Sequence, residues 1–178
     1  MRKNLSQILI PVFVFMLFGC DSKPEKDIEI ASSEIESERY FLEEIQTQKF
    51  DTLLVDQQIR LQISKTDLDT YVSRKYDADD KLQTDNYRDA EISLIISRDS
   101  KILLDTVFEK RQFLKYADKN FIDSSVFYNY WFKELDDDRL KFFGTISIPE
   151  TDIGFGFEHD FDLKTNQLDF ELLTDDEE

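Results

Sequence analysis

Cysteine, histidine and tryptophan are almost missing from this sequence, which has one residue of each. Cys20 alone can form no disulfide within the chain, and it cannot supply the clustered thiolates of a structural zinc site. The only histidine, His159, would have to serve any Ser-His-Asp triad or histidine metal site, and no G-x-S-x-G motif accompanies it. These scarcities predict a non-enzymatic protein without a cofactor or metal, whose stability comes from a packed core.

Basic residues are few as well, because 22 Lys and Arg face 39 Asp and Glu, for a net charge of -17. A field of this sign repels nucleic acid and bare anionic membrane. A protein partner is therefore expected to be basic, which would suit an inhibitor or an immunity-type binder of a basic protein. The alternative interpretation is a solvated acidic surface that serves solubility alone.

Long apolar runs are limited to one near the N-terminus, at residues 8–18, directly after a basic start. This run is too short to span a bilayer but suits the central region of a signal peptide. It ends in Leu-Phe-Gly-Cys, which resembles the lipobox of bacterial lipoproteins. That resemblance implies removal of residues 1–19 and acylation of Cys20, with palmitate among the acyl chains. The mature protein would be lipid-anchored to the outer membrane of the cell envelope, on its periplasmic or surface face.

Residues 20–48 are rich in Ser, Glu, Asp and Lys, a composition that favours an acidic tether. Ser33 and Glu36 have the spacing of a capping box, which predicts a short helix over about 34–46. The β domain is expected at residues 49–174, followed by an acidic tail at 175–178.

Strict alternation is the main pattern of that domain, and it is clearest from Ile153 to Leu163. Two hairpins are expected, Tyr87–Ser97 with Lys101–Phe108 and Val126–Leu135 with Arg139–Ile148. The change of period at 109–118 predicts one short helical interruption. The fold class is therefore all-β, an antiparallel sandwich or an up-and-down barrel of about eight strands. The acidic stretch after Tyr76 lacks the central glycine of a calcium loop, so a turn is expected there.

The arrangement of lipobox, acidic tether and small all-β domain resembles uncharacterised envelope lipoproteins of Bacteroidetes type. The residues that carry this resemblance are Phe108 and Phe113 around the helical interruption, Pro149-Glu150-Thr151-Asp152 before the long strand, and the closing hairpin. The resemblance implies a location and a fold class, without an activity.

Three groups of side chains are candidates for function. Residues 127–132 hold five aromatic residues, and a solvent-facing row of Tyr128, Tyr130 and Phe132, beside Trp131, could stack on a glycan or grip a protein. The alternative is a central strand buried on both sides.

His159 shares the apolar face of its strand, so it is either a functional residue or a core histidine bonded to backbone or a carboxylate. On the opposite face, Glu158, Asp160 and Asp162 have a spacing that a glycosidase could use, but such a row is also what a solvated strand face looks like.

The sequence thus predicts a non-enzymatic binding or interaction module at the cell envelope. A lipocalin-like barrel that carries a small apolar ligand is the alternative, because an eight-stranded barrel can enclose one.

Overall fold

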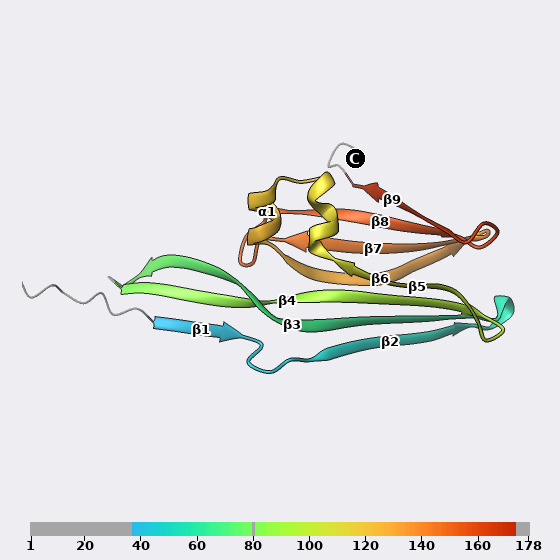
Figure 1. Cartoon of the computed structure of the whole chain (residues 1–178), viewed down its shortest axis with the longest axis horizontal. Helices are drawn as coiled ribbons and strands as arrows, with labels where there is room; N and C mark the ends of the chain where they lie inside the picture. Colours follow the sequence, from blue (N-terminus) through green and yellow to red (C-terminus); the bar gives the residue numbers. More distant parts are fainter. Residues whose placement is uncertain (1–36, 80, 174–178) are drawn as a thin grey trace, which may run out of the picture. The chain divides into compact units, whose positions relative to one another are not determined.

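The alternating segments of the chain form two β-sheets that face each other in a sandwich (Figure 1). This computed structural model describes residues 37–79 and 81–173. The expected signal peptide, Cys20, the first part of the tether and the acidic tail lie outside the described residues. The described residues belong to the compact unit Glu34–Glu178.

Sheet A comprises the first five strands: β1 (Ser37–Phe41), β2 (Thr47–Leu54), β3 (Ile59–Ala78), β4 (Lys81–Arg98) and β5 (Lys101–Glu109). A short 3-10 turn, η1 (Val55–Gln57), joins β2 to β3. β3 lies between β2 and β4, and the other edge of β4 is shared by two strands placed end to end. β1 covers residues 83–87 of that edge and β5 covers residues 91–98. The β1–β4 pair is parallel, and the other pairs of the sheet are antiparallel.

Sheet B is an antiparallel meander of β6 (Val126–Asp136), β7 (Arg139–Ser147), β8 (Gly154–Asp162) and β9 (Gln167–Leu172). The 3-10 helix η2 (Lys110–Lys115) and the helix α1 (Lys119–Ser124) connect the two sheets. The side chain of Asp118 caps α1 by accepting a hydrogen bond from the Phe121 amide at 3.0 Å. Within the described ranges, no helix is long and apolar enough to cross a membrane.

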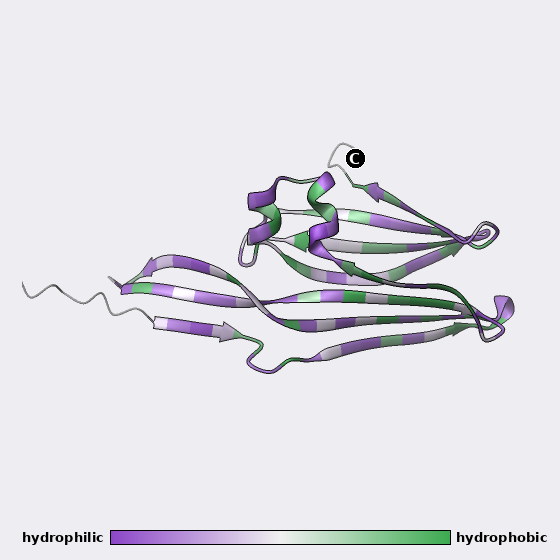
Figure 2. Cartoon of the chain, in the orientation of Figure 1, coloured by the Kyte–Doolittle hydropathy of each residue, from purple (hydrophilic) through white to green (hydrophobic). Residues whose placement is uncertain are grey.

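The core lies between the sheets. Apolar and polar residues alternate along the strands (Figure 2), and the apolar ones point into this core. Sheet A contributes mainly aliphatic side chains, among them Ile59, Leu61 and Ile92, whereas sheet B contributes mainly phenylalanines. Antiparallel strands with one covered face show this alternation because successive side chains point to opposite faces. In β8, Phe157 and Phe161 are fully buried, as the alternation predicts.

One glycine makes the aromatic layer possible. A Cβ atom built on Gly144 of β7 would lie 2.8 Å from Cε1 of Phe157 on β8, and closer still to Cζ. The ring of Phe157 therefore occupies the space above Gly144, and the two residues are direct partners in the sheet. A side chain at this position would displace a ring that has no exposed surface.

The edge of β4 has a gap between the ends of β1 and β5, and charged side chains fill it. Among the described strands, none pairs with Arg88, Asp89 or Ala90 on that side. The Ala90 amide donates to the Asp89 carboxylate at 2.9 Å, and the same carboxylate forms an ion pair with Lys110 of η2 at 2.8 Å. The side chain of Asp89 thus satisfies a backbone amide at the gap, and its ion pair with Lys110 provides the partner that a buried carboxylate requires.

Most of the expected architecture is confirmed. The hairpins β4–β5 and β6–β7, the helical interruption and the long strand near Ile153 are all present. The described strands number nine in two sheets, so the sandwich is confirmed and a closed barrel is not what they form.

The expected short helix over about 34–46 is wrong for its described part, because residues 37–41 form β1. The strand gains backbone hydrogen bonds from the edge of β4 and a stack of Phe41 on Tyr87, with centroids 4.6 Å apart. Helix propensity and capping are weak preferences that such tertiary contacts override. Residues 37–48, expected in the tether, therefore contribute β1 and the start of β2.

Candidate functional site

A cleft of about 840 Å³ opens at one end of the sandwich, where the apolar core stops. Residues from both sheets form it: the end of β1, the middle of β3 and β4, the start of β6 and the β7–β8 turn. The residues that line it include Phe41, Lys65, Asp67, Tyr87, Arg88, Tyr128, Glu150 and Asp152. A preformed hollow with apolar walls and a few polar groups is the usual form of a binding site.

The floor of the cleft contains Lys65, which continues the inward face of β3 beyond Ile63. Its Nζ donates a hydrogen bond to the backbone carbonyl of Tyr128 at 2.8 Å. That carbonyl is available because β6 has an irregularity in its pairing with β7 between Phe127 and Asn129. Burial lowers the pKa of Lys65, and the charge of Asp67 opposes this shift. Lys65 thereby joins the two sheets across the floor of the cleft.

The second floor cation, Arg88, is committed to the protein's own backbone. Its guanidinium donates to the carbonyls of Leu42, Glu43 and Leu68 at 2.9–3.0 Å. It also lies 4.6 Å from the ring centroid of Tyr71. Arg88 therefore holds the β1–β2 connection against β3.

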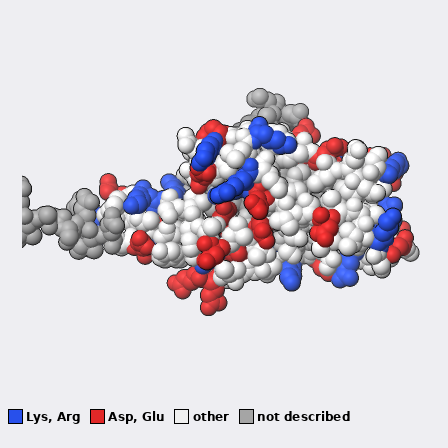
Figure 3. All heavy atoms as spheres, in the orientation of Figure 1, with Lys and Arg blue, Asp and Glu red and all other residues white. Residues whose placement is uncertain are grey.

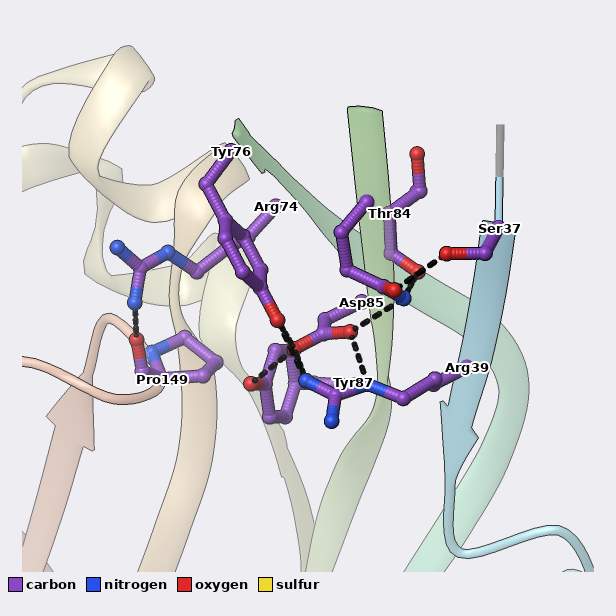
Figure 4. A network of polar contacts seen from close by, with 9 residues as sticks. Ser37, Arg39, Arg74, Tyr76, Thr84, Asp85, Tyr87 and Pro149 are labelled. Atoms are coloured by element: carbon purple, nitrogen blue, oxygen red, sulfur yellow. Dashed lines mark hydrogen bonds and ion pairs between the residues drawn. The ribbon is translucent and has the colours of Figure 1, made fainter. Parts of the chain in front are cut away.

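One wall of the cleft is the stacked pair Phe41 and Tyr87. The buried carboxylate of Asp85 lies between Tyr76, Tyr87 and Arg39 behind this wall (Figure 4). Asp85 accepts from Nε of Arg39 at 2.7 Å, from Nη2 of Arg39 at 2.5 Å and from the Tyr76 hydroxyl at 2.8 Å. These donors, Arg39 first, lower the pKa of Asp85 to about 2. The network fastens β1 to the β3–β4 hairpin, and so it positions Phe41 at the cleft.

The rim of the cleft is the β7–β8 turn, Pro149-Glu150-Thr151-Asp152. Arg74 of β3 donates to the Pro149 carbonyl (Figure 4). The Thr151 hydroxyl donates to the Ile148 carbonyl at 2.8 Å. Burial, together with the negative charge of Glu150, raises the pKa of Tyr87. The turn therefore places acidic side chains along the open side of the aromatic wall.

The aromatic residues of β6 do not form the expected solvent-facing row. Tyr130 is 8% exposed and faces the core with Phe132, whereas Tyr128 is 64% and Trp131 44% exposed. Register shifts at Phe127/Asn129 and Phe132/Glu134 interrupt the two-residue period. The alternative of a central strand is wrong too, because β6 is an edge strand of sheet B. Among these five residues, Tyr128 and Phe127 line the cleft.

His159 lies in the core and outside the cleft. Its Nδ1 is 3.0 Å from the Tyr130 hydroxyl, and its ring stacks on Phe108 with centroids 4.4 Å apart. Burial lowers the pKa of His159 to about 4, so the ring is neutral at pH 7. The expected core histidine is present, but its partner is a phenol rather than backbone or a carboxylate.

The acidic residues of the outer face of β8 are paired with cations. Glu158 lies 2.5 Å from Nζ of Lys133, and Asp160 lies 2.8 Å from Nε of Arg139. Asp162 accepts the backbone amides of Lys164 and Thr165 at the turn into β9. Among the described residues, no group of three His, Cys, Asp or Glu side chains is placed to hold a metal ion.

Sequence reasoning missed most of the cleft. Phe41, Lys65, Arg88 and Glu150 are far apart in the chain and come from different elements. Lys65 gave the best available signal, because a lysine interrupts the inward alternation of Ile59, Leu61 and Ile63. The aromatic run of residues 127–132 does indicate Tyr128, and Cys20 lies outside the described residues.

Comparison with known protein families gives a match over residues 30–161. The description of that family is "Domain of unknown function (DUF4738)", and the match covers more than half of the chain, including β1 to β7 and most of β8. No curated protein matches the sequence.

Proposed function

The chain belongs to the DUF4738 family, and from that premise we propose that it is a lipid-anchored envelope protein whose cleft binds a basic protein partner. The role is non-enzymatic. The observation that carries the proposal is the cleft itself, which has exposed aromatic walls and an acidic rim. The apolar run at residues 8–18, which is followed by Gly19 and Cys20, supports the anchor. The outer membrane is the proposed location.

The aromatic walls would supply the anchoring contacts. Tyr128 is 64% and Phe41 37% exposed on the two sides of the opening. Exposed aromatic side chains beside a preformed hollow are frequent centres of binding energy, because they bury a large area at low cost in side-chain entropy. Both residues are already held, Phe41 by its stack on Tyr87 and Tyr128 by the hydrogen bond of Lys65 to its carbonyl.

Charge favours a basic partner. The chain has a net charge of -17, and acidic side chains occur with basic ones between them on the face shown in Figure 3. At the rim of the cleft, neither Glu150 nor Asp152 takes part in the ion pairs of the described residues. Their charges are therefore available to a cationic group that approaches the opening.

The floor of the cleft does not cancel this preference. Arg88 forms an ion pair with Asp69 at 3.6 Å, and the negative charge of Asp67 acts on Lys65. Acidic groups therefore offset the two cations of the floor, and the acidic rim is what an approaching partner meets first. Opposite fields accelerate association, and their effect weakens as salt shortens their range. Binding of a basic partner should therefore depend on ionic strength.

The anchor is tested by labelling cells with radioactive palmitate. We expect label in the wild-type protein and none in the Cys20→Ala variant, which should be released from the membrane fraction. Equal labelling of the two proteins would contradict the anchor. This result is independent of what the cleft binds.

The partner is tested with the full chain purified in detergent and immobilised, using envelope extract and elution by a salt gradient. We expect a basic protein that elutes as ionic strength rises and that binds the Tyr128→Ala variant more weakly by about tenfold or more. Ile102→Ala is the matched control, because Ile102 is 58% exposed but belongs to β5 of sheet A.

Three outcomes would contradict the proposal: a partner that is acidic, one whose binding ignores salt, or one that binds Tyr128→Ala normally. A small apolar ligand found by native mass spectrometry in place of a protein would favour the carrier alternative.

A further inference from the structure

The solvent-facing side of sheet B divides into two halves of different chemistry. In one half, ion pairs connect neighbouring strands. Nζ of Lys141 on β7 lies 2.8 Å from the carboxylate of Asp136 on β6, and Nε of Arg139 on β7 lies 2.8 Å from that of Asp160 on β8. In the other half, towards the β7–β8 turn, Thr145 of β7 pairs with Asn129 of β6 on one side and with Gly156 of β8 on the other. The backbone amide of Leu173 donates to the Gly156 carbonyl. Charged side chains are the ordinary cover of a solvated sheet face, so the uncharged half requires a separate explanation.

The uncharged half is hollowed. A depression of about 580 Å³ runs over β6, β7 and β8, and it includes Gly154 and Gly156. A Cβ atom on Gly156 would lie 3.2 Å from the ring of Phe143 and 3.5 Å from Cδ1 of Leu173. The ring of Phe143 therefore packs over Gly156, and Leu173, which lines the depression, lies beside it.

Tyr128 lines this depression, and two further aromatic rings lie beside it, because the ring of Phe143 packs over Gly156. Trp131 is 44% exposed and packs against Phe143 on the neighbouring strand, with ring centroids 4.6 Å apart. Tyr128 lines both the depression and the cleft, and so it stands between them. These rings present flat apolar surfaces to solvent on a rigid sheet, which costs little side-chain entropy on binding.

Uncharged hydrogen-bonding groups lie beside the rings. The Thr145 hydroxyl donates to Oδ1 of Asn129 at 2.7 Å, which fixes the orientation of the amide. The amide nitrogen of Asn129 has no acceptor among the described residues, so its two N–H groups can donate to a ligand. Ser147 and Thr151 add hydroxyls at the end near the turn.

We propose that this depression binds an uncharged oligosaccharide. The C–H faces of sugar rings are apolar and fit against Trp131 and Tyr128, while their hydroxyls suit the amide and hydroxyls of Asn129 and Thr145. Charge disfavours an acidic glycan, because Asp152 is the charged residue that lines the depression. The inference concerns a surface separate from the cleft, and it does not depend on the basic partner.

The single tryptophan makes the test direct, because all tryptophan fluorescence of the chain comes from Trp131. The full chain in detergent is titrated with cellotetraose, maltotetraose and N,N′,N″,N‴-tetraacetylchitotetraose, and with tetragalacturonate as the acidic comparison. We expect a saturable change in fluorescence with at least one neutral tetrasaccharide and binding at least about tenfold weaker for tetragalacturonate. Calorimetry gives the affinity of variants that lack the tryptophan.

Trp131→Ala and Asn129→Ala should each weaken binding of the neutral saccharide by about tenfold or more. Val107→Ala should bind as the wild type does, because Val107 is 43% exposed but belongs to sheet A. Thermal unfolding shows whether each variant is folded. If Trp131→Ala does not fold, Asn129→Ala still tests the site.

Absence of saturation with all three neutral probes would overturn the proposal, as would equal binding of tetragalacturonate or unchanged binding by Asn129→Ala. Because Trp131 and Asn129 do not line the cleft, loss of saccharide binding would leave capture of a basic partner intact.

Discussion

The Tyr130 hydroxyl lies 3.0 Å from Nδ1 of His159, and both side chains are buried between the sheets. The ring of His159 is surrounded by Phe108, Phe157 and Phe170, which cannot stabilise its charged form as a carboxylate would. Burial lowers the pKa of His159 from 6.5 to about 4. The aromatic core thus contains one group that titrates near pH 6.5 only when the protein unfolds.

Stability should therefore fall as the pH is lowered from 6.5 towards 4. In that window the unfolded chain binds a proton on His159 and the folded chain does not. The free energy of unfolding is therefore highest above pH 6.5, as far as His159 is concerned, and it falls on acidification. The loss should be on the order of 3 kcal/mol at most. Urea unfolding at a series of pH values measures it. His159→Phe should lack this part of the pH dependence, and an identical pH profile for the two proteins would contradict the buried neutral histidine.

Gly144→Ala should destabilise the protein by about 1–3 kcal/mol, because the added methyl group overlaps the ring of buried Phe157. The midpoint of urea unfolding measures the effect. Gly156→Ala is the matched control on the neighbouring strand, where the nearest ring atoms would be 3.2 Å away on the solvent-facing side. Equal midpoints for the two variants would show that Phe157 can move away at little cost.

Asp85→Asn should loosen β1. The change replaces one acceptor oxygen of a side chain that is 4% exposed by an amide donor, which opposes the donors of Arg39 and Tyr76, and the expected loss is about 1–3 kcal/mol. Hydrogen exchange of residues 37–41 should accelerate. Asp51→Asn removes a similar two-point contact, with Arg60 at 2.8 and 2.6 Å, but both partners are largely exposed, so little change is expected. Equal protection of β1 in wild type and Asp85→Asn would contradict this role.

Ser100→Gly should stabilise the β4–β5 hairpin. Asp99 and Ser100 have φ values of 48° and 66°, as both central residues of a type I′ turn do, and glycine adopts this region without the strain of a Cβ atom. The expected gain is about 1 kcal/mol in the free energy of unfolding, measured by urea denaturation, because a residue with a Cβ atom pays about 1–2 kcal/mol in this region. Ser100→Val should have the opposite effect, and a loss of stability in Ser100→Gly would contradict the turn geometry.

Local patterns predicted the hairpins because their information is contained within the strands themselves. Phe142 and Ile146 of β7, or Phe157 and Phe161 of β8, alternate with other residues, and burial follows that alternation. The same reasoning failed in β6, where an irregular register places Tyr128 and Tyr130 on opposite sides. A bulge inserts one residue without a distinctive sequence signal, and the side chains that follow it change face.

The cleft was beyond reach for a different reason. Lys65 and Tyr128 are 63 residues apart, and Arg88 and Leu42 are 46 apart. Their proximity depends on which strands become neighbours, and nothing within either segment specifies the other. β1 shows the same dependence, since its five residues are exposed and gain their strand conformation from the edge of β4.

The parallel placement of β1 beside β4 has a consequence for the order of folding. Because synthesis begins at the N-terminus, Arg39 appears before Asp85, its partner 46 residues later. Closing this loop costs more entropy than forming the adjacent β3–β4 hairpin, so the hairpin should form first and β1 should dock onto it afterwards. Until that docking occurs, the edge of β4 at residues 83–87 is open to pairing with another chain. The earliest of the described strands to be synthesised is thus the one that covers this edge last.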